Sequence, residues 1–122
     1  MVKTVLTNGI RTDYEWKLNE SRKQKMGRFS LEEYDDRFEL WALAIFDRYR
    51  GKGHSLKMIE EIIRMTKDKK IVLYVQCDNE RAVHVYKKAG FQITDKGYVE
   101  LEFGQRRKIL EMTHFKNQEA VA

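Results

Sequence analysis

The sequence contains no proline and only one cysteine among its 122 residues. The single thiol, Cys77, cannot form an internal disulfide bond and cannot supply a cysteine-rich zinc site. A disulfide-stabilised secreted fold is therefore excluded, and we expect a reducing, cytoplasmic compartment. Without proline, helix ends and turns have to be set by Gly, Asn and Asp.

Long apolar runs are also missing. No segment approaches the roughly 18 to 20 apolar residues of a membrane-spanning helix, and the first sixteen residues lack a signal peptide's apolar stretch. The hydrophobic fraction of 42% is still enough for a buried core, which excludes a wholly disordered chain. At this length we expect one domain over residues 1–122.

The formal net charge of +5 is concentrated in the middle of the chain, where residues 39–90 carry 11 basic and 7 acidic side chains. Nucleic-acid binders more often carry a basic tail or a long basic stripe, so the distribution favours a local anionic ligand instead. Two short basic clusters, residues 22–25 and 106–108, are interpreted as solvated hairpin tips. No metal cofactor is expected, because the three histidines do not have the spacing of a ligand set.

Apolar periodicity and turn residues predict a mixed α/β (α+β) domain. Leu56, Ile59, Ile62 and Ile63 repeat at helical spacing, whereas residues 71–75 form a continuous apolar run typical of a strand covered on both faces. We expect strands at residues 4–7, 14–18, 26–31, 39–46, 71–75, 91–94, 98–103 and 109–115, helices from residue 56 and over residues 80–89, and a frayed tail at residues 116–122.

The segment Arg50-Gly51-Lys52-Gly53-His54-Ser55 lies between a predicted strand and a predicted helix. Small residues allow close approach of a ligand, and the unpaired N–H groups of a helix N-terminus favour an anion such as pyrophosphate. The spacing matches neither a Walker A loop nor a dinucleotide-binding fingerprint. From this segment alone, an anion site and an ordinary strand–helix turn are equally good interpretations.

A second notable segment runs from Asn79 to Phe91. Taken alone, Asn79 is a helix-capping residue, Tyr86 is a half-buried core aromatic, and Gly90 ends the helix. Trp16 and Trp41 are likewise interpreted as core residues, and Cys77 as a packing residue.

In this order and spacing, the two segments resemble the GNAT superfamily of acyl-CoA-dependent N-acyltransferases. The first matches the superfamily's Gln/Arg-x-x-Gly-x-Gly/Ala signature, with Ser55 at the last small position. The second contains Asn-x-x-Ala-x-x-x-Tyr-x-x-x-Gly-Phe intact. The resemblance implies a mostly antiparallel mixed sheet with helices on its faces, in which a bent strand leads into a pyrophosphate-binding turn and a helix.

The resemblance also implies roles for individual residues. The backbone of Leu43, Ala44 and Ile45 would pair with the pantetheine arm of acetyl-CoA, and Asn79 would contact the same arm. The backbone N–H groups of Arg50, Gly51, Lys52, Gly53, His54 and Ser55 would hold the pyrophosphate. Tyr86 would protonate the departing thiolate, and Glu39 is a candidate general base for the acceptor amine, although a structural role for Glu39 is equally compatible.

Two functions remain open. The first is acetyl transfer from acetyl-CoA to a primary amine, by direct attack in a ternary complex, with residues 39–94 as the acetyl-CoA-binding core. The second is a binding or inhibitory module, because only 38 residues precede Glu39 and no pair of helices is evident in this reduced acceptor-side region. Closing strands are expected at residues 95–115. A homodimer is plausible for such an open domain, whereas nucleic-acid and membrane partners are not expected.

Overall fold

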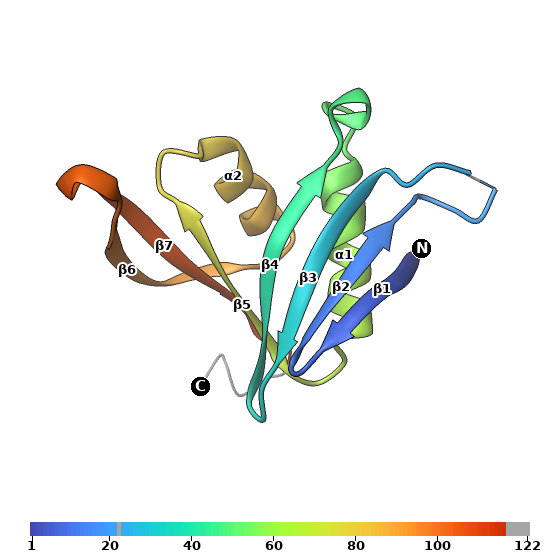
Figure 1. The fold of residues 1–122 in the computed structure, drawn as a ribbon, viewed down its shortest axis with the longest axis horizontal. Helices are drawn as coiled ribbons and strands as arrows, with labels where there is room; N and C mark the ends of the chain where they lie inside the picture. Colours follow the sequence, from blue (N-terminus) through green and yellow to red (C-terminus); the bar gives the residue numbers. More distant parts are fainter. Residues whose placement is uncertain (22, 117–122) are drawn as a thin grey trace.

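The structure is a computed structural model that describes residues 1–21 and 23–116. In the described residues, seven strands form one sheet in the order β1-β2-β3-β4-β5-β7-β6 (Figure 1). The elements are β1 (Val2–Asn8), β2 (Arg11–Trp16), β3 (Gly27–Glu33), β4 (Arg37–Ile45), the 3₁₀ turn η1 (Asp47–Tyr49), α1 (His54–Met65), β5 (Lys70–Gln76), α2 (Glu80–Lys88), β6 (Gln92–Glu100), the 3₁₀ turn η2 (Glu102–Gly104) and β7 (Arg106–His114). This confirms the predicted mixed α/β, mostly antiparallel architecture.

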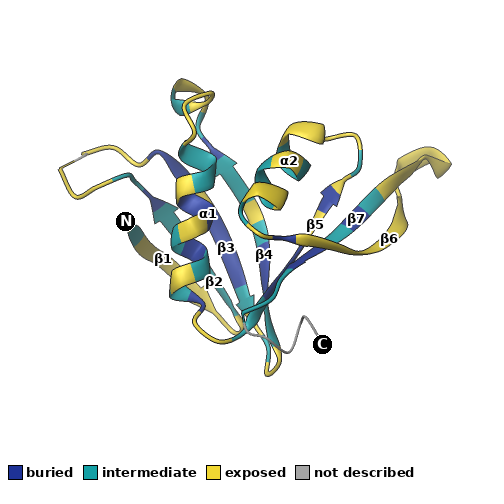
Figure 2. Ribbon diagram, turned by 180° about the vertical axis from the view of Figure 1, so that it is seen from behind, coloured by how far each residue is buried: buried dark blue, intermediate teal, exposed yellow. Residues whose placement is uncertain are grey.

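Both helices lie on the same face of the sheet (Figures 1 and 2). All neighbouring strands are antiparallel except β4 and β5, which are parallel and are connected through α1. α2 then connects β5 to β6, which lies further along the sheet in the same direction. Because such crossovers are right-handed, two of them running in one direction place their helices on one face. The opposite face carries no helix in the part of the chain that is described.

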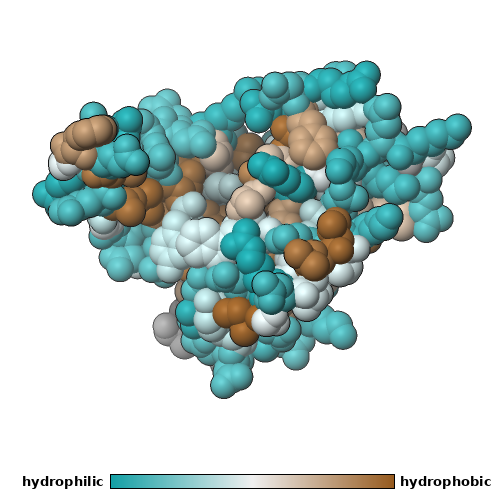
Figure 3. All heavy atoms as spheres, in the orientation of Figure 1, coloured by the Kyte–Doolittle hydropathy of each residue, from teal (hydrophilic) through white to brown (hydrophobic). Residues whose placement is uncertain are grey.

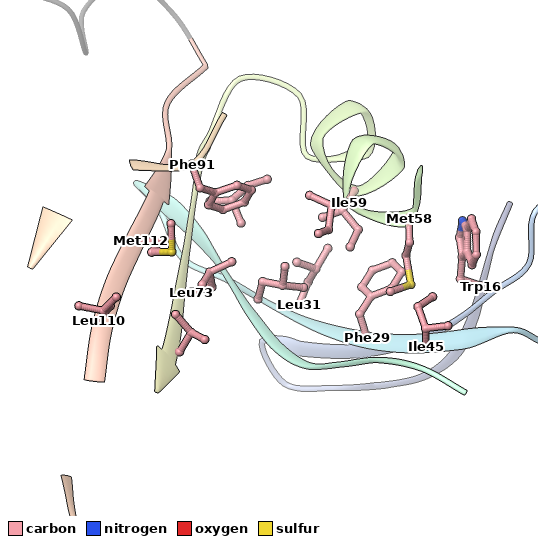
Figure 4. Packing of buried hydrophobic residues seen from close by; sticks show 14 of the residues in the cluster. Trp16, Phe29, Leu31, Ile45, Met58, Ile59, Leu73, Phe91, Leu110 and Met112 are labelled. Carbon is pink, nitrogen blue, oxygen red and sulfur yellow. The ribbon is translucent and has the colours of Figure 1, made fainter. Parts of the chain in front are cut away.

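The hydrophobic core fills the space between α1 and the sheet (Figure 4). Ile59 and Ile62 of α1 are completely buried, as their helical spacing predicts, and Met58, which the predicted repeat did not include, is completely buried beside them. They pack against β3, β5 and β7, with Trp16 closing one end of the core. Burial of each large apolar side chain contributes roughly 1.5–3 kcal/mol, so this single layer supplies most of the stabilisation.

The helix-free face is polar over β2 and β3. Asp13 accepts a hydrogen bond from the hydroxyl of Ser30 at 2.5 Å, and Arg11 forms ion pairs with Asp13 and Glu32. An antiparallel sheet can leave such a face in water, with polar residues alternating with buried ones. The strands β1, β2 and β3 therefore need no covering helix on this side.

Three sequence predictions differ from the structure. Residues 91–94 and 98–103 were expected to form separate strands, but β6 runs unbroken from Gln92 to Glu100 and residues 102–104 form η2. Gly97 does not interrupt β6 because it is paired with Ile109 in the β6–β7 ladder. Phe91 is a buried core residue that precedes the strand.

Trp41 was expected in the core but lies on the helix-free face, because it follows the buried Leu40 and strand residues alternate in direction.

A β-bulge bends β4 at Ala42, whose φ is 54°. The pairing register with β3 shifts between Ser30↔Trp41 and Arg28↔Ala44, so that β4 has one residue more than its partner. The pairing of β4 with β5 ends just before the bulge, at Leu40↔Leu73. Beyond this pair the two strands diverge, which opens the sheet between them (Figure 1).

The bulge predicts how Ala42 tolerates substitution. A left-handed conformation costs an L-residue about 1–2 kcal/mol and is worse for a β-branched one. We expect Ala42→Gly to raise the free energy of unfolding by about 0.5–1 kcal/mol and Ala42→Val to lower it by about 2 kcal/mol, measured by urea denaturation. Equal stability of the two variants would contradict a strained Ala42.

Candidate functional site

A groove of about 540 Å³ lies on the helical face, where β4 and β5 diverge. Its walls are the end of β4, the turn into α1, and one side of α2. The lining residues are Leu43, Ala44, Ile45, Tyr49, Arg50, Gly51, Gly53, His54, Ser55, Leu56, Ile59, Asn79, Arg81, Ala82, His84, Val85, Tyr86 and Lys88. The sequence predictions for the cofactor site and Tyr86 fall in this one groove, except that Lys52 is not among its lining residues.

The turn between β4 and α1 has the geometry of an anion site. Gly51 and Gly53 have φ values of 78° and 77°, and Gly53 is the N-cap of α1 without a side-chain capping bond. The first turn of α1 contains no acidic residue that would neutralise the positive end of the helix dipole. Arg50 fixes the turn to the strand, because its Nε donates a hydrogen bond to the carbonyl of Ile45 at 3.0 Å.

α2 presents polar and basic side chains to the same groove. Asn79 is the N-cap of α2, and its side chain accepts a hydrogen bond from the N–H of Ala82 at 3.3 Å. A Cβ atom placed on Gly51 would lie 4.0 Å from Nη2 of Arg81, so this guanidinium reaches the turn from α2. Arg81, His84 and Lys88 also line the groove and were not predicted. Arg81, Val85 and Lys88 are spaced by four and three residues, so helical periodicity places them on one side of α2 and could have indicated the two cations.

Tyr86 lies within the groove wall, where its ring is 5.8 Å from the ring of the buried Phe91. Burial raises the pKa of the Tyr86 phenol above its usual value near 10. The hydroxyl group therefore keeps its proton throughout the neutral pH range. A neutral phenol in an apolar wall is suited to donate a proton to an anion that forms in the groove.

Glu39 is buried on β4 and is paired with Arg37. Both Nε and Nη2 of Arg37 donate hydrogen bonds to Oε2 of Glu39, at 3.0 and 2.8 Å. Glu39 does not line the groove. Its charge nevertheless helps to raise the pKa of Tyr74 on the helix-free face. The assignment of Glu39 as a general base stays a prediction.

A second cavity, of about 430 Å³, lies on the helix-free face beside the separated strands. Trp41 of β4 and Tyr74 of β5 form one wall, with ring centroids 5.5 Å apart. The β6–β7 hairpin forms the other wall. The lining residues are Trp41, Tyr74, Asp95, Lys96, Gly97, Tyr98, Val99, Ile109 and Glu111.

Two other features are absent from residues 1–21 and 23–116. These residues contain no group of three or more His, Cys, Asp or Glu side chains placed to hold a metal ion. None of the helices described in this range is long and apolar enough to cross a membrane.

Comparison with known proteins identifies the family. The model of the acetyltransferase (GNAT) family matches residues 13–91, which is more than half of the chain. The chain therefore belongs to the GNAT acetyltransferase family, which confirms the resemblance found in the sequence.

Among curated proteins, mycothiol acetyltransferase from Corynebacterium efficiens is 29% identical over 68 residues. The matched segment covers 53% of this chain and 23% of that protein, so the chain spans less than a quarter of the curated relative's length.

Several solved structures share the fold. Spermidine N-acetyltransferase from Vibrio cholerae, in complex with CoA and spermine, has a TM-score of 0.75 and 22% identity, covering 88% of this chain and 66% of that chain. Ribosomal-protein-S18-alanine N-acetyltransferase from Escherichia coli has a TM-score of 0.75 and 16% identity, covering 91% and 72%. An acetyl-CoA-bound GNAT family acetyltransferase from Elizabethkingia anophelis has a TM-score of 0.71 and 20% identity, covering 87% and 76%.

We expect substitutions of Gly53 and Gly9 to cost similar stability but to differ in their effect on CoA binding. Both have positive φ, and a Cβ atom on either would meet nothing within 4 Å. We expect Gly53→Val and Gly9→Val to lose similar stability, of the order of 1–2 kcal/mol. Only Gly53→Val should weaken CoA binding, by tenfold or more in calorimetric titration, because the altered turn redirects the first N–H groups of α1. Unchanged affinity in Gly53→Val would contradict the anion site.

Proposed function

We propose that this protein is an acetyl-CoA-dependent N-acetyltransferase whose acceptor is a primary amine. The observation that carries the proposal is the groove itself, which joins an anion-binding turn, an unpaired strand edge and a protonated tyrosine. The CoA and acetyl-CoA complexes among the structures with the same fold support this choice of co-substrate. We place the acetyl-CoA-binding core in residues 39–94, within a single domain.

Acetyl-CoA would lie along β4 in this groove. Beyond Leu40, β4 has lost its ladder with β5, so the backbone of residues 43–45 can pair with the amide groups of the pantetheine arm. The N–H groups of residues 50–55 would bind the pyrophosphate, aided by the N-terminus of α1. Arg81 and Lys88 would add positive charge from α2.

The reaction needs no covalent enzyme intermediate. The acceptor first gives one proton to a base, either water or the predicted base Glu39, since an alkylammonium with a pKa of ~10.4 has no free electron pair for attack. Its nitrogen then bonds to the thioester carbonyl carbon while the C–S bond breaks. The departing sulfur takes the phenol proton of Tyr86, and the second proton of the nitrogen passes through water to the Tyr86 phenolate, so amide and free thiol are formed and the tyrosine is protonated again. The protein's main contribution is to hold the two reactants together.

Tyr86→Phe tests the proton donor. We expect acetyl-CoA affinity to change less than twofold and the turnover number to fall about 10²-fold, the usual scale for a positioned acid. Because burial raises the pKa of Tyr86, the alkaline loss of activity in the wild type should begin above pH 10 and be absent from the variant. Thiol release measured against pH gives both values.

Tyr14→Phe is the control. The Tyr14 ring packs against the core, with its centroid 4.9 Å from that of Phe29, and it does not line the groove. Equal turnover in Tyr86→Phe and Tyr14→Phe would remove Tyr86 from the mechanism. Binding of acetyl-CoA without any turnover would instead favour the binding module.

Arg81→Gln tests the phosphate contact from α2. We expect about tenfold weaker CoA binding at low ionic strength, with a smaller difference at 0.5 M salt, because salt screens exposed charges. Arg64→Gln, on the exposed side of α1, should leave the affinity unchanged. Calorimetric titration at two salt concentrations measures both effects. A loss that is independent of salt would contradict an electrostatic role for Arg81.

A further inference from the structure

The second cavity opens on the same gap in the sheet as the cofactor groove, but from the opposite side. Leu40 and Leu73 are the last paired residues of β4 and β5, and both are buried on the helical side. Trp41 and Tyr74 follow them directly, so their side chains project from the other face. β4 and β5 diverge beyond this point (Figure 1), so a thioester reaching through the gap from the groove would meet the cavity beside this aromatic pair.

Three carboxylates surround the aromatic pair. Glu39 lies two residues before Trp41, Glu111 is the cross-strand partner of Tyr74, and Asp95 is the partner of Glu111. Burial raises the pKa of Tyr74, and the negative charges of Glu39, Glu111 and Asp95 raise it further. These charges act at a hydroxyl group of the cavity lining, so the part of the cavity beside Tyr74 has a negative potential.

Arg37 is the cation that acts on Tyr74, and burial together with Glu39 and Glu111 outweighs its effect on the pKa of Tyr74. Arg37 is engaged by Glu39 and by Asp36, at 2.8 and 2.9 Å.

Lys96 is in the lining but is paired in the ladder with Leu110, which is buried on the helical side of β7. Its side chain therefore leaves β6 on the other face from Asp95. Two further cations lie toward the tip of the β6–β7 hairpin: the guanidinium of Arg106 is 4.5 Å from the ring centroid of Tyr98, and Arg107 is paired with Val99.

The rest of the cavity is apolar and open. Ile109 and Val99 lie on the hairpin wall, and hydrophobic side chains gather over the β6–β7 hairpin in Figure 3. A Cβ atom on Gly97 would meet nothing within 4 Å, so this glycine leaves room between the two walls. The indole N–H of Trp41 is buried and has no hydrogen-bond partner in residues 1–21 and 23–116, as in a site that a ligand completes.

We propose that this cavity binds the acceptor, and that the acceptor is an aliphatic amine with a second amino group, protonated at neutral pH, and no anionic group. The inference rests on the proposed acetyltransferase function. The attacking amino group has to be neutral, so it gains little from three carboxylates. A second ammonium stays charged throughout the reaction and is attracted by both the carboxylates and the aromatic faces. The methylene chain between the two nitrogens packs against Ile109 and Val99.

Three small amines test this substrate class. 1,4-Diaminobutane has the second ammonium, 1-aminobutane lacks it, and 4-aminobutanoate replaces it with a carboxylate. We expect kcat/KM, measured as thiol release from acetyl-CoA, to be at least tenfold higher for the diamine than for the monoamine, and lowest for the amino acid. A monoamine or amino acid used as well as the diamine would overturn the inference but leave the acetyltransferase function standing.

Variants of the cavity locate the effect. Glu111→Gln and Asp95→Asn should each reduce the preference for the diamine over the monoamine by fivefold or more, with KM for acetyl-CoA unchanged. Glu60→Gln, on the exposed side of α1, is the matched control and should keep the full preference. An unchanged preference in both cavity variants would overturn the assignment of these carboxylates.

Gly97→Leu tests the position of the acceptor without removing a charge. The side chain would fill the open space between the walls, so we expect turnover of the diamine to fall more than tenfold while acetyl-CoA still binds with wild-type affinity. Full diamine turnover in this variant would show that the acceptor binds elsewhere. If acetyl-CoA binds to the wild type but none of the three amines releases thiol, the acetyltransferase proposal fails, and this inference fails with it.

Discussion

The parallel pairing of β4 with β5 stops after four residue pairs, and the rest of the site depends on that early end. Up to Leu40 and Leu73, the two strands are held together by the ladder and by the core beneath it. Beyond this point a bulge at Ala42 turns β4 away, which leaves backbone groups without ladder partners on the β5 side. Backbone polar groups need partners when they are covered, so this edge is suited to pair with an extended, amide-containing ligand.

Placing both helices on one face separates two kinds of chemistry. The helical side supplies a glycine-rich turn, a helix N-terminus and the basic residues of α2, which together favour an anion. The helix-free side supplies carboxylates around Trp41 and Tyr74, which favour a cation. The sheet keeps the two sets of charges apart except at the gap. A negatively charged co-substrate and a positively charged acceptor can then meet without competing for the same groups.

The sequence predicted the cofactor side of the molecule better than the acceptor side. Residues 50–55 and the run from Asn79 to Gly90 combine turn residues with helical periodicity, and these local signals survive in the structure as one groove. The acceptor side has no such local signal. Trp41 and Tyr74 come from strands 33 positions apart in sequence, and only the register of the parallel ladder brings their rings within 5.5 Å. Strand alternation around Leu40 was the one clue that Trp41 faces away from the core.

The bulge and the continuous β6 also depend on tertiary pairing. Alanine has no preference for positive φ, so nothing local marks Ala42, and the bend arises because β4 must follow β3 while leaving β5. Gly97 suggested a break between two strands, but the β7 ladder holds it in one extended strand. Glu39 was correctly predicted to lie on a strand. Its burial in an ion pair with Arg37 could not be predicted, because two side chains at this spacing share a strand face that can equally be exposed to solvent.

β6 has a consequence for how the two sides of the molecule move. All nine of its residues are exposed, and it is hydrogen-bonded to β7 alone at the edge of the sheet. A strand with so few buried contacts opens locally at a much lower free energy than the core strands. The outer wall of the acceptor cavity can therefore fluctuate and adapt to acceptors of different length, whereas the wall of the cofactor groove formed by β4 and α1 rests on buried residues.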